Sequence, residues 1–291
     1  MLNRENVKSF WQNQVGRDGI HWLPSVESLA TLEHTKERAE FRHQEESKFI
    51  DRHFKLNQDD ILIDLGAGAG QWSRHLAPRV KKVYAVELAD GLIEIGKKLA
   101  SNEGITNIAF ISCPAEDFIH DGVADVVLIS GLLCVLDDEQ YQQVIKNIKK
   151  YLKIGGTVLL RESTSAIGIK LVHLNPKGQH SALYRTPDEI VNSFAKEGFL
   201  LKECAQFFED DSILNRDPRG KLYYFNFRSI DKLSDQDHAQ YYGSLGEEFL
   251  ALKLYKEALS CYEKALEYNQ DEVMQALVEK LKRLCEIAPH L

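Results

Sequence analysis

The sequence of 291 residues lacks the side-chain clusters that would mark a metal site or a disulfide framework. Its five cysteines are scattered, odd in number and without a C-x-x-C pair, which favours reduced thiols in a protein core. The ten histidines are equally dispersed, with no H-x-x-x-H pattern and no neighbouring cysteines. We therefore predict no metal site.

Long apolar runs are also missing. No window approaches 18 uninterrupted apolar residues, so the sequence predicts no membrane span. The first residues, Met1–Glu5, lead directly into polar sequence without the apolar core of a signal peptide. From these two observations we expect a cytoplasmic protein without a membrane partner.

Basic residues are too few for a strong phosphate-binding surface. The chain has 36 Lys and Arg against 44 Asp and Glu, a net charge of −8. Proteins that bind nucleic acids usually present a basic face, so we expect no nucleic-acid partner. A hydrophobic content of 44% is typical of a globular chain, and the length allows one large domain with an appendage or two modest domains.

The most informative segment that is present is an apolar run ending in a glycine-rich turn. The run Ile61–Leu65 is followed by Gly66, Gly68 and Gly70, and a second apolar run, Val83–Glu87, ends in an acid 21 residues after the first glycine. A nucleoside-binding crossover needs this order of buried strand, tight turn, helix N-terminus and a carboxylate for the ribose hydroxyls. Glycine suits the turn because it permits positive φ and close approach of a ligand.

The spacing of the glycines distinguishes this turn from a nicotinamide-binding turn, which reads G-x-G-x-x-G. Here the spacing is G-x-G-x-G, Gln71 stands in place of the last glycine, and Asp64 lies two residues before the first. The pattern resembles the first motif of the class I S-adenosylmethionine-dependent methyltransferases, D/E-x-G-x-G-x-G. Their ligand has no pyrophosphate but carries a cationic sulfonium and an amino group, which a nearby carboxylate would stabilise.

The resemblance extends over about residues 40–228 through further landmarks in the family's order. A strand at 108–112 precedes the loop Cys113–Phe118, and a strand at 125–130 precedes the loop Gly131–Leu136. Tyr151–Glu162 matches the family's L-x-x-G-G turn into a fifth strand. The alternation of strands and helices predicts an α/β fold. Its expected form is a doubly wound, seven-stranded, mostly parallel sheet with an antiparallel edge hairpin (199–208 and 221–228), plus a C-terminal α-helical hairpin.

The resemblance implies S-adenosyl-L-methionine as the cofactor. Glu87 would accept charge-assisted hydrogen bonds from both ribose hydroxyls, although an acid can also simply end a strand. Arg42, on an expected N-terminal helix, would reach the methionine carboxylate unless that helix only packs on the sheet. The residues that the resemblance assigns to the cofactor lie after the first four strands, where their alternative role is to shape loops: Asp64, Gly66, Ala67, Gly68, Gly70, Glu87, Leu88, Ala115, Glu116, Asp117, Ser130 and Leu132.

Methyl transfer needs few catalytic groups from the protein, because a sulfonium methyl is already activated and alignment supplies most of the rate acceleration. A base helps where the acceptor is a hydroxyl, whereas a neutral amine needs only its lone pair presented. The candidate catalytic bases are His173, His180 and Glu162, with surface histidines as the alternative interpretation of the first two. By resemblance, Tyr184 and Arg185 would line the substrate pocket, where Arg185 either binds an anionic substrate group or is an ordinary solvated charge.

Residues 239–289 differ in pattern from the rest of the chain. From Tyr242 to Ala265, aromatic and small residues follow the offsets of a tetratricopeptide repeat, with Gln270 in place of the usual closing proline. One repeat cannot form a solenoid, because each repeat buries its face against a neighbour. We therefore expect 239–289 to pack on the enzyme domain, on a second copy in a homodimer, or on a protein partner.

These observations divide the chain into an N-terminal helical cap (1–60), a methyltransferase domain (61–230) and a tetratricopeptide-like helical extension (231–291). The predicted activity is methyl transfer to oxygen or nitrogen of a small polar acceptor, such as a sugar, a nucleotide-sugar or a secondary metabolite. One alternative is a protein methyltransferase that recruits its target through the C-terminal helices. Another is a non-catalytic scaffold, against which the intact glycines and Glu87 argue.

Overall fold

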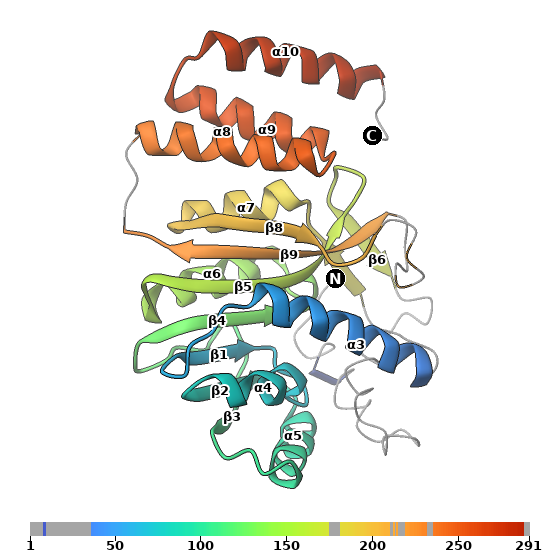
Figure 1. The fold of residues 1–291 in the computed structure, drawn as a ribbon, viewed down its shortest axis with the longest axis vertical. Helices are drawn as coiled ribbons and strands as arrows, with labels where there is room; N and C mark the ends of the chain where they lie inside the picture. Colours follow the sequence, from blue (N-terminus) through green and yellow to red (C-terminus); the bar gives the residue numbers. More distant parts are fainter. Residues whose placement is uncertain are drawn as a thin grey trace.

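A seven-stranded sheet forms the centre of the protein, with the strand order β3-β2-β1-β4-β5-β9-β8 (Figure 1). The computed structural model describes residues 8–9, 36–174, 181–209, 212, 214, 219–231 and 235–287. The strands of the sheet are β1 (Ile61–Leu65), β2 (Lys82–Glu87), β3 (Ile108–Ser112), β4 (Ala124–Ser130), β5 (Leu152–Ser165), β8 (Phe199–Gln206) and β9 (Gly220–Ser229). Most of the expected N-terminal cap, residues 1–7 and 10–35, lies outside the described residues.

The directions of the strands confirm the predicted fold. Strands β1 to β5 pair in parallel, and β9 runs antiparallel to both β5 and β8, so the late hairpin occupies the β8 edge of the sheet. Leu62 and Ile63 point to opposite faces of β1, and both side chains are fully buried. Such apolar runs are what a parallel sheet covered on both faces requires.

Helices cover the two faces of the sheet. On one face, Ile50 and Trp72 of the helices α3 and α4 pack against apolar residues of β1 and β2. On the other face, Ile145 and Phe194 of α6 and α7 belong to the larger core cluster. The bounds of these elements and of a separate hairpin are α3 (Lys36–His53), α4 (Gln71–Leu76), α5 (Asp90–Asn102), α6 (Asp138–Tyr151), α7 (Pro187–Lys196), β6 (Leu171–Leu174) and β7 (Ser181–Tyr184).

Three helices follow the sheet: α8 (Asp235–Ala251), α9 (Tyr255–Tyr268) and α10 (Glu272–Ile287). They stack beyond the β8 edge (Figure 1), so the predicted C-terminal helical hairpin is confirmed. Phe249 and Tyr262 are buried in the larger core cluster, and the Tyr241 hydroxyl accepts a hydrogen bond from the Leu201 amide of β8 at 2.8 Å. The helices therefore pack on the sheet domain, whereas their kinship to tetratricopeptide repeats and the domain boundaries stay predictions. Among the described helices, none combines the length and apolar character of a membrane span.

The close approach of α8 and α9 generates a test with two glycines of α8. A Cβ at Gly246 would lie 2.8 Å from the ring of Tyr262, whereas one at Gly243 would meet only the terminal methyl of Met274 at 3.2 Å. We expect Gly246→Ala to lower the free energy of unfolding by about 1–3 kcal/mol through overpacking. The control, Gly243→Ala, should be neutral or gain up to about 1 kcal/mol, because alanine favours helix. Urea denaturation measures both; equal stabilities would show that the glycine does not set the helix spacing.

Candidate functional site

A cleft lies at the carboxyl ends of the parallel strands, where the chain order reverses between β1 and β4. Ligands of open α/β sheets bind at such a switch point. The empty space in the cleft, including open solvent at its mouth, is about 940 Å³, enough for a small organic ligand. The lining comes mainly from the loops after the first four strands: Lys8, Gly66, Gly68, Ala69, Val86, Glu87, Leu88, Ala89, Leu92, Cys113, Pro114, Ala115, Glu116, Ser130, Gly131, Leu132, Val135, Leu136 and Gln140.

The glycine-rich turn brings backbone to the wall of the cleft. Gly66, Gly68 and Gly70 have φ of 72°, 57° and 72°, in the left-handed region that favours glycine. The amides of Gly66 and Ala67 donate to one carbonyl of β2 at 2.9 Å, which fixes the turn. A Cβ at Gly66 would lie 3.0 Å from the Leu132 side chain, whereas one at Gly68 would meet no atom within 4 Å. Of the predicted turn residues, Gly66 and Gly68 line the cleft, and Ala67 and Gly70 do not.

Glu87 lies at the end of β2 and lines the cleft. One carboxylate oxygen accepts a hydrogen bond from the Gly68 amide at 2.9 Å, and the other accepts from the Ala89 amide at 2.8 Å. Burial raises the pKa of this carboxyl, and the bonds from the amides oppose that shift. A carboxylate offers about four lone-pair sites, so these bonds leave acceptor capacity for a ligand. Glu87 thus fixes the turn and faces the cleft; Leu88, next to it, also lines the cleft.

Asp64 lies beneath the turn, outside the lining of the cleft. Its carboxylate is 1% exposed and accepts a hydrogen bond from the Ser73 hydroxyl at 2.6 Å, which ties β1 to α4. Burial raises the pKa of Asp64 to about 7; the Ser73 bond lowers it, and the nearby charge of Glu87 raises it. Asp64 therefore supports the glycine-rich turn from inside the core and does not face the cleft.

The loop after β3 forms another wall. Ala115 and Glu116 line the cleft, whereas Asp117 is exposed and lies outside the lining. Glu116 accepts a hydrogen bond from the Gln140 side chain at 2.6 Å. Gln140, which also lines the cleft, forms a capping box with Asp137 at the start of α6. The sequence analysis missed Gln140, although an acid followed three residues later by glutamine is a recognisable capping signal.

The loop 131–136 after β4 forms a further wall of the cleft. Ser130, at the end of β4, and Leu132, within the loop, both line the cleft. The peptide groups of Leu133 are held from two sides: its amide donates to Glu162 at 2.7 Å, and its carbonyl accepts from Arg185 at 2.9 Å. Both charged side chains are 2% exposed. A buried carboxylate and a buried guanidinium therefore hold the same residue of the loop in place.

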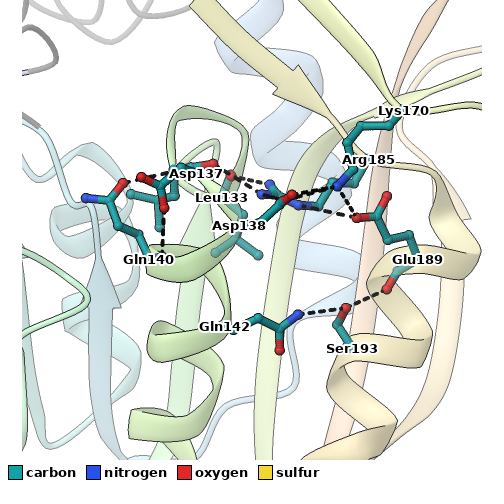
Figure 2. Close-up of polar contacts among 10 residues, drawn as sticks. Leu133, Asp137, Asp138, Gln140, Gln142, Lys170, Arg185, Glu189 and Ser193 are labelled. Carbon is teal, nitrogen blue, oxygen red and sulfur yellow. Dashed lines mark hydrogen bonds and ion pairs between the residues drawn. The ribbon is translucent and has the colours of Figure 1, made fainter. Parts of the chain in front are cut away.

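Arg185 holds this loop through both terminal nitrogens of its guanidinium (Figure 2). Its Nη2 donates to the Leu136 carbonyl at 3.2 Å and to Asp138 at 2.7 Å, and its Nε lies 3.7 Å from Glu189. The guanidinium carbon lies 3.9 Å from the ring centroid of Tyr141. Arg185 is therefore not the solvated charge considered as one alternative, and it does not line the cleft. Its contact with a substrate stays a prediction.

The candidate bases are less well placed. Both oxygens of Glu162 accept backbone amides, burial raises the pKa of this carboxyl, and the residue does not line the cleft. His180 lies outside the described residues, and of His173 the structure describes only the backbone, in β6.

Tyr184 packs against a small cluster that includes Val135 of the cleft wall. In the part of the chain that the structure describes, no three His, Cys, Asp or Glu side chains gather as metal ligands would.

The raised pKa of Asp64 generates a prediction of pH dependence. An acid whose pKa is about 7 in the folded state and 3.8 in the unfolded state binds more protons when folded between these values, so stability falls as pH rises through this window. We expect Asp64→Asn to reduce that slope by up to about 1.4 kcal/mol per pH unit and to be more stable than the wild type above pH 7. Urea denaturation from pH 4 to 8, with the exposed Asp59→Asn as control, tests this; parallel curves would contradict it.

The Arg185 contacts generate a second prediction. Arg185→Gln leaves the Leu133 and Leu136 carbonyls without their donors, so we expect the free energy of unfolding to fall by about 2–4 kcal/mol. The control is Lys170→Gln, which removes surface ion pairs to the same Asp138 and Glu189 and should change stability by less than about 1 kcal/mol. Thermal and urea denaturation compare the two; similar values would mean that the loop keeps its shape unaided.

The site can now be compared with known proteins. Residues 62–156 match a family model described as a methyltransferase domain. The chain is 32% identical over 105 residues to phosphoethanolamine N-methyltransferase 1 of Triticum aestivum, an alignment that covers 35% of this chain and 21% of that protein. Alignments with the first curated relatives span from about a fifth to about half of their lengths.

Solved structures share the fold at low sequence identity. DhpI in complex with S-adenosylhomocysteine matches with a TM-score of 0.53 and 17% identity, covering 79% of this chain and 98% of that one. The 1,6-didemethyltoxoflavin-N1-methyltransferase of Burkholderia thailandensis matches with a TM-score of 0.51 and 19% identity, covering 64% and 76%. The family match and the fold together agree with the prediction from the sequence. Residues 62–156 are thus similar to a methyltransferase domain, and the chain shares the Rossmann-like fold of these two solved structures.

Proposed function

We propose that this chain transfers a methyl group from S-adenosyl-L-methionine to oxygen or nitrogen of a small polar acceptor, such as a sugar, a nucleotide-sugar or a secondary metabolite. The observation that carries the proposal is the cleft in which Gly66 and Gly68 present bare backbone beside the Glu87 carboxylate. The names of the wheat relative and of the Burkholderia enzyme describe methylation of small molecules, which supports a small acceptor.

The residues of the cleft fit the parts of this cofactor. Glu87 keeps acceptor capacity for the ribose, and the open space at Gly68 admits a ligand against the backbone. In this proposal Ala115 and Glu116 flank the adenine, and Ser130 and Leu132 flank the methionine part. The cofactor supplies an activated sulfonium methyl. The protein contributes alignment and exclusion of water, which the doubly held loop 131–136 favours because its backbone is fixed before ligands bind.

The C-terminal helices support a structural role more than recruitment of a protein substrate. The faces of α8 and α9 that carry Phe249, Ala258 and Tyr262 are buried in the core cluster shared with the sheet domain. The same side chains are therefore unavailable to a peptide. We propose that the extension 231–291 stabilises the β8 edge of the sheet, in keeping with the packing role expected for a lone repeat.

Replacement of Glu87 tests the cofactor site. Glu87→Gln removes the charge and keeps one of the two acceptor oxygens, so we expect the binding free energy of S-adenosylhomocysteine to weaken by about 1.5–3 kcal/mol. Isothermal titration calorimetry measures this loss, and thermal denaturation confirms that the variant folds. Asp117→Asn is the matched control, because Asp117 is exposed and outside the lining, and its affinity should stay at the wild-type value.

The outcomes separate the alternatives. A wild-type protein that binds neither S-adenosylmethionine nor S-adenosylhomocysteine would leave only the scaffold. An unchanged affinity in Glu87→Gln would place the ribose elsewhere. Release of S-adenosylhomocysteine in the presence of small hydroxyl or amine acceptors supports the proposed reaction, whereas methylation of proteins alone would replace it with the protein-methyltransferase alternative.

A further inference from the structure

A buried group of three charged side chains lies behind the Gly131 end of the cleft, and the proposed function does not use it. The Arg42–Glu46–Arg161 cluster joins two residues of α3 to one of β5, and its members are 5%, 3% and 8% exposed. One oxygen of Glu46 accepts from Arg42 at 3.3 Å and from Nη2 of Arg161.

One carboxylate of the described residues faces both arginines of this cluster. Two guanidiniums, which remain protonated in proteins, share the single carboxylate of Glu46. Arg42 donates further to the Leu214 carbonyl. Glu162, next to Arg161 in the sequence, lies on the opposite face of β5, where it holds the Leu133 amide. The guanidinium carbons of Arg42 and Arg161 also lie 5.0 Å and 5.7 Å from the ring centroids of Phe208 and Phe207.

Part of the Arg161 guanidinium has no hydrogen-bond acceptor among the described residues. Its Nε is buried without a partner, and no side chain or carbonyl among the described residues accepts from its Nη1. Nη1 lies 3.7 Å from the position that a Cβ on Gly131 would take. Gly131 lines the cleft, and its neighbour Ser130 pairs with Arg161 in the register of β4 and β5. Only a residue without a side chain separates this guanidinium from the cleft.

We propose that Arg161 binds an anionic group, a phosphate or a carboxylate, of the methyl acceptor. This inference rests on the proposed function, because it assigns the acceptor to the same cleft. The lining comes from Lys8, the loops after β1 to β4 and Gln140 of α6, whereas Arg161 belongs to β5, one strand further out. A group bound at Arg161 therefore lies beyond the residues assigned to the adenosine, beside Gly131, which stands between the two residues assigned to the methionine part. Guanidinium suits phosphate and carboxylate because it donates several fixed hydrogen bonds.

The experiment measures anion binding to the protein saturated with S-adenosylhomocysteine, with inorganic phosphate and phosphoethanolamine as probes in calorimetry. We expect Arg161→Gln to weaken the binding of at least one probe about tenfold or more, the range for a charged hydrogen bond, while the affinity for S-adenosylhomocysteine changes less than about twofold. The matched control is Arg228→Gln, an exposed arginine of β9 paired with Thr157 at the far end of β5, which should leave both affinities unchanged.

A second variant protects the test against a folding defect in Arg161→Gln. Glu46→Gln leaves both guanidiniums in place and removes their counter-charge, so the probes should bind more tightly than to the wild type. A wild-type protein that binds S-adenosylhomocysteine but neither probe would overturn the inference and leave the proposed function intact. A loss of S-adenosylhomocysteine affinity in Arg161→Gln matching the loss for the probes would also overturn it, since Arg161 would then hold the cofactor. Failure of the wild type to bind S-adenosylhomocysteine would instead remove the proposed function.

Discussion

The geometry of the cleft depends on the buried carboxylate of Glu87. It ends β2 and accepts one amide from the glycine-rich turn after β1 and one from the start of the segment that leads into α5. Two loops that are distant in sequence are thereby fixed relative to each other, and lone pairs of the same carboxylate still face the cleft. Burial disfavours the ionised form, so the amide bonds are what keep a carboxylate usable at this position.

The wall of the cleft formed by the loop 131–136 is also held by hydrogen bonds between buried charged side chains and backbone groups. Glu162 and Arg185 lie on the two sides of Leu133 and hold the loop through its backbone rather than through its side chains. Side chains of that loop, such as Leu132 and Val135, remain available to line the cleft. A wall held by buried charges resists rearrangement, because moving it would remove hydrogen bonds from both charged groups inside the core. Such rigidity suits a reaction that is accelerated mainly by alignment.

Much of the fold was predictable because its determinants are local. The apolar runs, the glycine spacing and the acid at Glu87 predict consecutive strands and turns, and their alternation with helices predicts a parallel sheet. The seven-stranded, doubly wound form was predicted from the family resemblance. The supporting charges were not predictable, because their partners meet only in the folded chain. Glu46 and Arg161 are 115 residues apart in sequence, and Arg185 and Leu133 are 52 residues apart. A sequence pattern shows that these residues are charged but not whether a carbonyl, a carboxylate or a ligand lies opposite.

Arg185 illustrates why the position of a residue along the sequence does not reveal its partners in the fold. A basic residue just before a helix that begins with acids looks like a surface charge, since an arginine gains nothing from the positive end of a helix dipole. The turn at 133–135 ends beside it, however, and presents carbonyls that need donors inside the core. Arg185 supplies those donors, and the Tyr141 ring covers its flat face. Both Arg185 and Arg161 keep a buried Nε without a hydrogen-bond acceptor among the described residues, but only Arg161 has its Nη1 beside Gly131, 3.7 Å from the position of a Cβ there, at the edge of the cleft.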